Sequence, residues 1–217
     1  DTTDTVSISF APNNDLVWNN NAGETIDPAT AAALVAGFDT GVINADAPDT
    51  TPWTYSVANA NLDFLAAGDS ITFSYTITAT DSQDDTATTT VAFTITGTND
   101  DPVIIGTASG SAQEDNTLPS TGTLTSTDID TNATATWSIQ GPDNGTYGSL
   151  SLAGNSGEWT YTLDNGTDGN ASVVQNLYQG ESVTDTFTVK VTDEFGGFDQ
   201  QTVTITITGT NDDPVIS

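Results

Sequence analysis

One run of eleven residues occurs twice in this chain. The run Thr-Ile-Thr-Gly-Thr-Asn-Asp-Asp-Pro-Val-Ile fills positions 94–104 and again 206–216, a separation of 206 − 94 = 112 positions. Other residues repeat at the same separation: Leu65 with Leu177, Asp81 with Asp193, and Val91 with Val203. Self-similarity at a fixed long period is the signature of a repeat architecture. The sequence therefore predicts two tandem repeats, with their boundary inside 97–104.

The two repeats differ in their opening segments. Trp53-Thr54-Tyr55 matches Trp159-Thr160-Tyr161 at a separation of 106, so the second repeat has six more residues before Leu177. Residues 1–52 depart from the pattern. We predict a divergent first domain at 1–98, a linker at 99–102 and a second domain at 103–217 that ends in another copy of the linker motif. Because that second copy is followed by no further domain here, we expect a longer protein.

Hydrophobic residues recur at every second position within each repeat. Phe73, Tyr75 and Ile77 alternate with serine and threonine, and the pattern returns at 187–191 and 203–207. This period is typical of half-buried antiparallel strands, and threonine suits the solvent side of a strand. The sequence predicts an all-β fold of two β-sandwiches.

Two short helical segments interrupt the strand pattern. Asp27 as N-cap, Pro28 at the first helical position, an alanine-rich body through Ala36 and Gly37 as the stop predict one helix in the first domain only. Residues 172–179 predict a helical turn before Gly180, ahead of a strand that begins near 183.

The charge balance restricts the classes of function. Thirty acidic residues stand against one basic residue, Lys190, which disfavours nucleic-acid and anionic-membrane binding. The chain has no cysteine, histidine or methionine, so oxygen atoms remain as metal ligands and the usual nucleophile and base pairs of enzymes are missing. We expect no enzyme. The acids are balanced either by bound divalent cations or by a solvated acidic coat.

Several acids cluster near the predicted linker. Asn99-Asp100-Asp101 places consecutive oxygen donors between the domains, and Pro102 fixes the exit direction of the chain. Calcium takes about six to eight oxygens, so loops of the second domain must contribute. Asp128 and Asp130 follow a predicted strand at 122–126, and an extended chain would point both in one direction. Asp193 ends another strand and begins the turn 193–197.

Four motifs together resemble a known family. The run Gly-Thr-Asn-Asp-Asp-Pro-Val, the Gly-Asp-Ser and Gly-Glu-Ser segments at 68–70 and 180–182, the Trp-Thr-Tyr segments and the turn at 191–197 resemble VCBS repeats. These repeats belong to large bacterial surface adhesins of the RTX type, exported by type I secretion. The linker is also similar to that of cadherins. The resemblance covers nearly all of 105–217 and, in the first repeat, 53 onward.

The resemblance implies fold, location and function together. It implies tandem immunoglobulin-like or cadherin-like sandwiches joined end to end, forming a calcium-rigidified extracellular extender that projects an adhesive tip and contributes to biofilm attachment. The expected partners are neighbouring repeats of the same chain, without membrane insertion; the ligand of the full-length adhesin stays open. The metal ligands implied in this way are Asn99, Asp100, Asp101, Asp128, Asp130 and Asp193. Further candidates are Asp81, and Glu114 with Asn211, Asp212 and Asp213 as a half-site.

Other interpretations of the same residues stay open. Asn-Asp-Asp-Pro is also ordinary loop chemistry, and Asp81 and Asp193 also fit hairpin turns without metal. Trp159 and Tyr161 are expected in the core, because alternate strand positions share a face. The alternative function is a carbohydrate- or ice-binding module that uses calcium and exposed threonine or tryptophan. An acidic spacer without metal is the third hypothesis.

Overall fold

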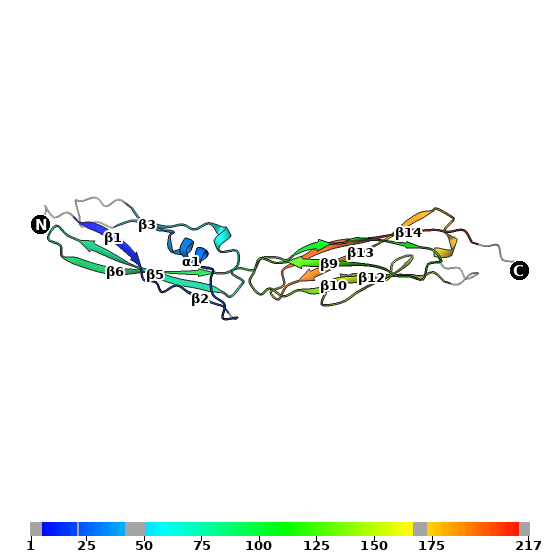
Figure 1. Cartoon of the computed structure of the whole chain (residues 1–217), viewed down its shortest axis with the longest axis horizontal. Coiled ribbons are helices and arrows are strands. Elements are labelled where there is room, and N and C mark those ends of the chain that lie inside the picture. The colour runs from blue at the N-terminus through cyan, green and yellow to red at the C-terminus, as the bar shows by residue number, and fades with distance from the viewer. Residues whose placement is uncertain (1–5, 21, 42–50, 167–172, 213–217) are drawn as a thin grey trace. The chain divides into compact units, whose positions relative to one another are not determined.

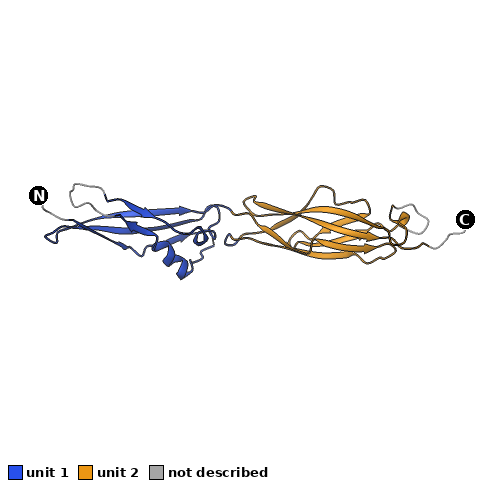
Figure 2. Cartoon of the chain, turned by 90° about the horizontal axis from the view of Figure 1, so that it is seen from above, with its two compact units in different colours: residues 1–99, 130–132 blue, residues 100–129, 133–217 orange. Residues whose placement is uncertain are grey.

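The computed structural model describes residues 6–20, 22–41, 51–166 and 173–212. The chain divides into two compact units, shown in different colours in Figure 2. Unit 1 comprises residues 1–99 with 130–132, and unit 2 comprises residues 100–129 with 133–217. Apart from one short α-helix and two 3₁₀ turns, the regular elements within these ranges are β-strands, so the predicted all-β class is confirmed. No helix within these ranges is long and apolar enough to cross a membrane.

Unit 2 is a sandwich of two four-stranded sheets. One sheet has the order β10-β13-β14-β8 and the other β11-β12-β9-β7; Figure 1 labels β9, β10, β12, β13 and β14. Its strands are β7 (Val103–Gly106), β8 (Ser109–Gln113), β9 (Ser120–Thr127), β10 (Thr136–Gln140), β11 (Gly148–Leu152), β12 (Glu158–Leu163), β13 (Ser182–Thr192) and β14 (Phe198–Thr208). The predicted helical turn is a 3₁₀ turn at Val174–Asn176; position 172 lies outside the described residues. All pairings are antiparallel except β8 with β14, which is parallel.

Unit 1 has a more open arrangement. Its strand β5 pairs with β6 along one edge and with β1 and β2 along the other, while β3 and β4 form a separate two-stranded sheet. The elements are β1 (Ser7–Pro12), β2 (Val17–Asn19), α1 (Pro28–Val35), β3 (Phe38–Thr40), β4 (Trp53–Tyr55), a 3₁₀ turn at Asn59–Asn61, β5 (Ser70–Thr80) and β6 (Thr86–Thr96).

Helix α1 forms where its capping residues predict it. The Asp27 carboxylate accepts hydrogen bonds from the backbone N–H groups of Ala29 and Thr30, both at 3.1 Å, and the helix ends at Val35 with Ala36 as C-cap. Proline costs nothing at the first helical position because its missing N–H would have no partner there. Leu34 is the buried residue that ties the helix to the core of unit 1.

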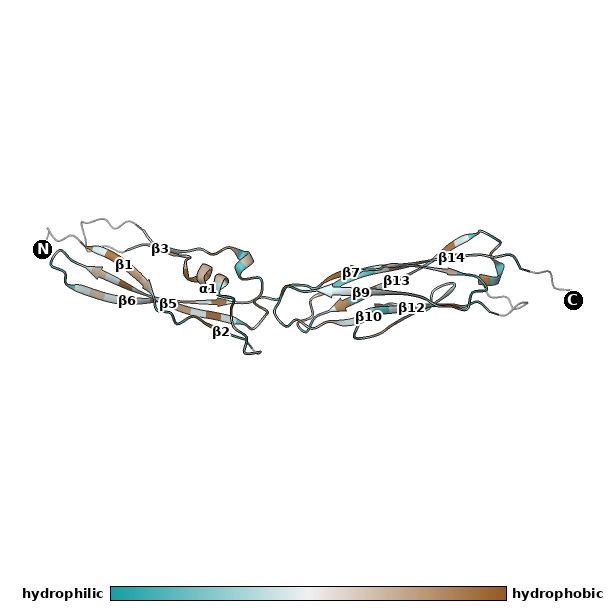
Figure 3. Ribbon diagram, in the orientation of Figure 1, coloured by the Kyte–Doolittle hydropathy of each residue, from teal (hydrophilic) through white to brown (hydrophobic). Residues whose placement is uncertain are grey.

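Each unit has its own hydrophobic core. Phe38, Leu65, Ile71, Phe73 and Tyr75 belong to the core of unit 1. The core of unit 2 includes Leu124, Trp159, Tyr161, Val189, Val203, Ile205 and Ile207. Hydrophobic and hydrophilic residues alternate along the strands in Figure 3, as the two-residue period predicts. Trp159 and Tyr161 are core residues, as predicted, with 1% and 0% of their surface exposed.

One buried carboxylate organises a loop of unit 2. Asp185 on β13 is buried, and it accepts hydrogen bonds from the N–H groups of Thr146 at 2.8 Å and Tyr147 at 3.0 Å and from the Tyr161 hydroxyl at 2.7 Å. Burial and the contact with Asp185 raise the pKa of Tyr161. Gly145 must be glycine here, since a Cβ would lie 2.4 Å from Asp185 Oδ2.

Replacing Asp185 by alanine should therefore destabilise unit 2 strongly. The Asp185→Ala variant leaves two backbone donors and a phenol without their acceptor, which costs about 2–4 kcal/mol in the free energy of unfolding. Tyr161→Phe is the control, because it removes one hydrogen bond and should cost about 1 kcal/mol. Urea denaturation of the full chain measures both. Equal effects of the two variants would contradict this account of the loop.

Candidate metal centre

The fourth residue of the repeated motif is a glycine that packs against backbone carbonyls in both units. A Cβ on Gly97 would lie 2.2 Å from the carbonyl oxygen of Ala66, and one on Gly209 would lie 2.6 Å from that of Tyr178. Gly97 N–H donates to the Asp69 carbonyl and Gly209 N–H to the Glu181 carbonyl, both at 2.9 Å. The same contacts thus fix where the chain leaves the last strand of each unit, immediately before the Asn-Asp-Asp residues.

At the end of unit 2, this exit lies beside a buried glutamate. Glu114 follows β8, and its side chain is 1% exposed. Its backbone N–H donates to the Thr208 carbonyl at 3.0 Å, and its Oε2 accepts from Thr210 N–H at 2.8 Å. Its other oxygen, Oε1, is buried and accepts no hydrogen bond within the described residues. A buried anionic oxygen in this situation is costly unless a cation or a proton satisfies it.

Further oxygen atoms surround Glu114. Asp115 Oδ2 accepts from the Thr210 hydroxyl at 2.7 Å, and Asp115 N–H donates to Asn165 Oδ1 at 3.0 Å. Gln175 joins the cluster by donating to the Asn165 carbonyl at 2.8 Å. Asn211 and Asp212 are exposed, and Asp213 lies outside the described residues. We call the set Glu114, Asp115, Thr210, Asn211 and Asp212 the terminal acidic cluster.

The electrostatics of this cluster disfavour a bare negative charge on Glu114. Burial raises the pKa of Glu114, and the charges of Asp212 and Asp115 act in the same direction, while the hydrogen bonds from Thr210 oppose them. The one cationic side chain of the sequence cannot neutralise the cluster from its place on β13, where Lys190 Nζ lies 4.1 Å from the centroid of the Phe198 ring.

The donor chemistry of this cluster fits a hard cation. Carboxylate, hydroxyl and carbonyl oxygens are the ligands that calcium prefers, and the buried Oε1 of Glu114 is one such oxygen with unused acceptor capacity. Within the described ranges, no group of three or more acidic, histidine or cysteine side chains is close enough to form a ready-made metal site. Any ion bound at Glu114 would therefore also need backbone, amide or water oxygens.

The other predicted ligands are distributed over both units. Asn99 and Asp130 belong to unit 1, whereas Asp100, Asp101 and Asp128 belong to unit 2. Asp100 and Asp101 are exposed, and Asp130 is buried. The chain at 128–130 is not extended as expected, and that Asp128 and Asp130 point in one direction stays a prediction. The chain leaves β9 at Thr127 and bends at 129–130, and a turn follows in which Asn132 has a φ of 63°, so the two-residue alternation of a strand does not continue.

Asp193 and its counterpart Asp81 build the same hairpin turn. Asp193 Oδ1 accepts from the N–H groups two and four residues ahead, at 2.8 and 2.9 Å, and Asp81 Oδ1 does the same at 2.9 Å in both cases. Each aspartate N–H also donates at 3.0 Å to the carbonyl four residues ahead. Both residues therefore have the structural turn role that the sequence left open beside metal binding. Their role as metal ligands stays a prediction.

Some residues of these sites were not predicted from the sequence. Asp115 and Thr210 belong to the terminal acidic cluster, Asn165 accepts from Asp115 N–H, and Asp199 anchors β7 by accepting from Ile104 N–H at 2.8 Å. Asp115 could have been predicted, because it follows Glu114 directly in the sequence. Asn165 and Asp199 could not, because each reaches its partner from a distant part of the chain.

The comparisons with known proteins place this chain in a family. The family described as "Bacterial cadherin-like domain" matches residues 99–209, which is more than half of the chain. The chain belongs to the bacterial cadherin-like domain family. Cadherin-like domains are non-enzymatic, extracellular adhesion modules, so the chain is a module of this adhesion-related class.

Solved structures of cadherins are similar at low identity. Protocadherin Gamma B2 extracellular cadherin domains 1-5 has a TM-score of 0.46 at 11% identity, covering 97% of this chain and 34% of that one. Human CDH23 EC21-23 has a TM-score of 0.44 at 11% identity, covering 96% and 59%. Mouse Protocadherin-24 EC1-3 has a TM-score of 0.38 at 14% identity, covering 94% and 58%. The chain spans less than two thirds of each. Among curated protein sequences, none matches.

The raised pKa of Glu114 predicts how stability depends on pH without calcium. A carboxyl group whose pKa is higher in the folded state favours folding while it is protonated, and this contribution is lost as pH rises from about 4.5 through the raised value. In chelator, Glu114→Gln should therefore be more stable than the parent at pH 7, with no gain at pH 4. Urea denaturation at both pH values measures this, and a loss of stability at pH 7 would contradict it.

The turn role of Asp81 predicts unequal effects of two substitutions. Asp81→Ala removes an acceptor of two backbone N–H groups and should cost about 1–2 kcal/mol in the free energy of unfolding. Asp81→Asn keeps a carbonyl oxygen in place and should cost about 0.5 kcal/mol or less. Chelator must be present in both measurements, so that any contribution from metal is absent. If Asp81→Asn lowers the free energy of unfolding as much as Asp81→Ala, the turn requires the negative charge of Asp81 rather than its hydrogen bonds.

Proposed function

We propose that this chain is a calcium-rigidified extender segment of a bacterial cell-surface adhesin, of the VCBS and RTX type exported by type I secretion. Such a segment is a structural spacer in biofilm or cell adhesion. The observation that supports it best is Glu114, a glutamate that is 1% exposed, has a buried oxygen without a hydrogen bond in the described residues, and lies where a linker motif leaves the last strand. Membership of an extracellular adhesion family supports the location.

In the proposed terminal site, Glu114 Oε1 is the first ligand. Glu114 Oε2 stays on Thr210 N–H, which holds the carboxylate in place, and Asp115 is held by the Thr210 hydroxyl. Asn211, Asp212 and Asp213 supply further oxygens from the linker motif. Calcium contributes positive charge and room for about six to eight oxygens. Because calcium takes about six to eight oxygens, the ligands named here make only a half-site, which should bind calcium weakly.

The first copy of the motif forms the second proposed site. Asn99, Asp100 and Asp101 are the linker ligands, and Asp128, Asp130 and Asp193 are the loop ligands. Five aspartates brought together without a cation would repel strongly, so the linker at 99–102 should bend freely in chelator and stiffen in calcium. Extracellular calcium modules bind at about 10⁻⁴–10⁻³ M, so the joint would stiffen only after export.

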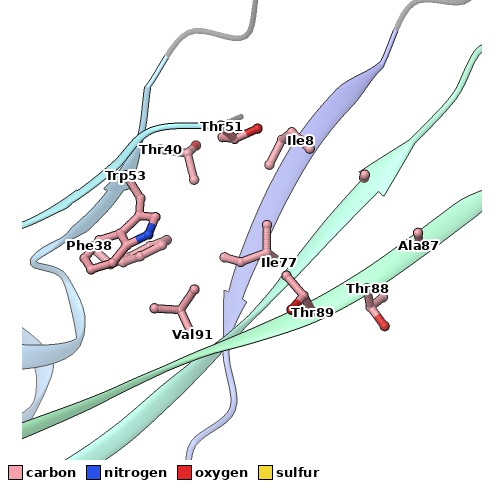
Figure 4. A pocket seen from close by; sticks show the side chains of 11 residues that line it. Ile8, Phe38, Thr40, Thr51, Trp53, Ile77, Ala87, Thr88, Thr89 and Val91 are labelled. Atoms are coloured by element: carbon pink, nitrogen blue, oxygen red, sulfur yellow. The ribbon is translucent and has the colours of Figure 1, made fainter. Parts of the chain in front are cut away.

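The alternative of a carbohydrate- or ice-binding module has weaker support. Trp53 is 49% exposed, as sugar stacking requires, but the groove beside it (Figure 4) is lined by apolar side chains and threonines, without a charged or amide side chain to bind sugar hydroxyls. The threonines of β5 and β6 pair across the two strands, as Thr76 with Thr90 and Thr78 with Thr88. They therefore follow the strand register and form no separate array.

The extender proposal predicts that calcium raises the free energy of unfolding and restricts bending at the 99–102 linker. At about 10 mM calcium and the affinities above, ligand linkage should add about 1.4–2.7 kcal/mol per site. Thermal melting and solution scattering, each with calcium and with chelator, measure the two effects. Unchanged melting and an unchanged maximum dimension on chelation would favour the inert acidic spacer instead.

Two variants test the two proposed calcium sites independently. Asp100→Asn with Asp128→Asn should leave both units folded, reduce the calcium-dependent rise in Tm and broaden the distribution of dimensions. Glu114→Gln should reduce calcium binding at the terminal site and leave the scattering response of the 99–102 linker intact. The matched control is Asp143→Asn, an exposed loop acid of unit 2 outside both proposed sites. If Asp143→Asn reduced the calcium-dependent rise in Tm as much as the site variants, calcium would act by unspecific charge screening.

A further inference from the structure

A glutamate in the β13–β14 turn links two loops of unit 2. Glu194 lies in the turn 193–197, and its Oε2 accepts hydrogen bonds from both the backbone N–H and the hydroxyl of Thr134, at 2.7 and 2.8 Å. Thr134 belongs to the loop 128–135, which joins β9 to β10. Hydrogen bonds to an ionised carboxylate are among the stronger ones in proteins. This contact therefore holds the β9–β10 loop against the β13–β14 turn.

The turn itself does not require this glutamate. Asp81 of unit 1 accepts the same two turn hydrogen bonds as Asp193. The separation of 112 maps Glu194 onto position 194 − 112 = 82, where unit 1 has Ser82. Because the hairpin of unit 1 closes with serine at this position, the glutamate of unit 2 has a task other than building the turn. Its two hydrogen bonds with Thr134 indicate that this task is to link the two loops.

The β9–β10 loop has little regular structure of its own. Strand β9 ends at Thr127, the chain bends at 129–130, and Asn132 in the following turn has a φ of 63°. Residues 133–135 belong to no regular element. The hydrogen bonds of Thr134 to the turn therefore fix the loop just before β10 begins.

The two linked loops contain the loop ligands of the proposed calcium site. Asp193 directly precedes Glu194, and Asp128 and Asp130 lie four to six residues before Thr134. Carboxylates on two separate loops repel each other when they approach without a cation. Ordering mobile loops when a ligand binds also costs conformational entropy, which lowers the affinity. A hydrogen bond that joins the loops beforehand opposes both effects.

We propose that Glu194 is a positioning residue of the calcium site at the first linker motif. It keeps the β9–β10 loop, with Asp128 and Asp130, next to the turn that contains Asp193, so less freedom is lost when calcium binds. This inference rests on the proposed function. Partners that orient metal ligands from outside the site typically contribute about 10–100-fold in affinity for the metal.

Two substitutions at one position distinguish positioning from charge. Glu194→Gln removes the negative charge but keeps an oxygen that accepts from Thr134, whereas Glu194→Ala removes both. Positioning predicts that Glu194→Ala weakens calcium binding about tenfold or more, while Glu194→Gln keeps most of the affinity. An NMR titration of the full chain measures this through the calcium-dependent shifts of the amides at 128–135 and 193–197. Because these shifts are resolved by residue, they are read separately from the terminal site.

Hydrogen exchange in chelator tests the link without calcium. The Thr134 amide should exchange about tenfold or more faster in Glu194→Ala than in the parent, and at close to the parental rate in Glu194→Gln. The matched control is Glu158→Ala, which removes the charge of an exposed glutamate in β12 of the same unit. A purely structural role of Glu194 would change the exchange at Thr134 and leave the calcium affinity of the folded chain unchanged.

Three results would overturn the proposal. Equally weak calcium binding in Glu194→Gln and Glu194→Ala would identify Glu194 as a ligand or a source of negative charge. Equal affinity in Glu194→Ala and Glu158→Ala would show that the link does not act on calcium. A parent chain without calcium-dependent shifts at 128–135 and 193–197 would overturn the proposed calcium site as well, and the link at Thr134 would then serve the fold alone.

Discussion

The long hairpin of each unit sets the position of almost everything else. β5 pairs with β6 over eleven residues and β13 with β14 over eleven, in registers related by the 112-residue separation. One end of each hairpin is closed by an aspartate that accepts two turn N–H groups, and the other end is fixed where Gly97 or Gly209 packs against backbone carbonyls. A slip of one residue would turn every core side chain of these strands to solvent.

Few acidic residues lie within the strands of these hairpins, and an aspartate lies at the turn end of each one. β5 and β6 contain no charged residue, and β13 and β14 contain only Asp185, Lys190 and Asp199. Asp185 and Asp199 each accept backbone hydrogen bonds that hold other segments in place. The acids without such a structural task gather in loops and linkers, where solvent or a cation can stabilise them.

Local sequence signals predicted the features that depend on local physics. The alternating strands, the helix capped by Asp27 and the turn at Asp193 appear as predicted because a few neighbouring residues determine each one. Features that depend on distant partners were missed. The bend at 129–130 was not predicted, and Asn165 reaches Asp115 from fifty residues away. The exposure of Trp53, 49% against 1% for Trp159, was not predicted either.

The parallel pairing of β8 with β14 bears on how unit 2 would respond to tension. β8 lies near the start of the unit and β14 at its end, and their five paired positions run in the same direction. A pull on the two ends of the unit draws these strands past each other along their length, so their hydrogen bonds are loaded together. An antiparallel pair pulled from one end would instead open one bond at a time. The parallel pair of β8 and β14 would therefore resist such a pull in shear.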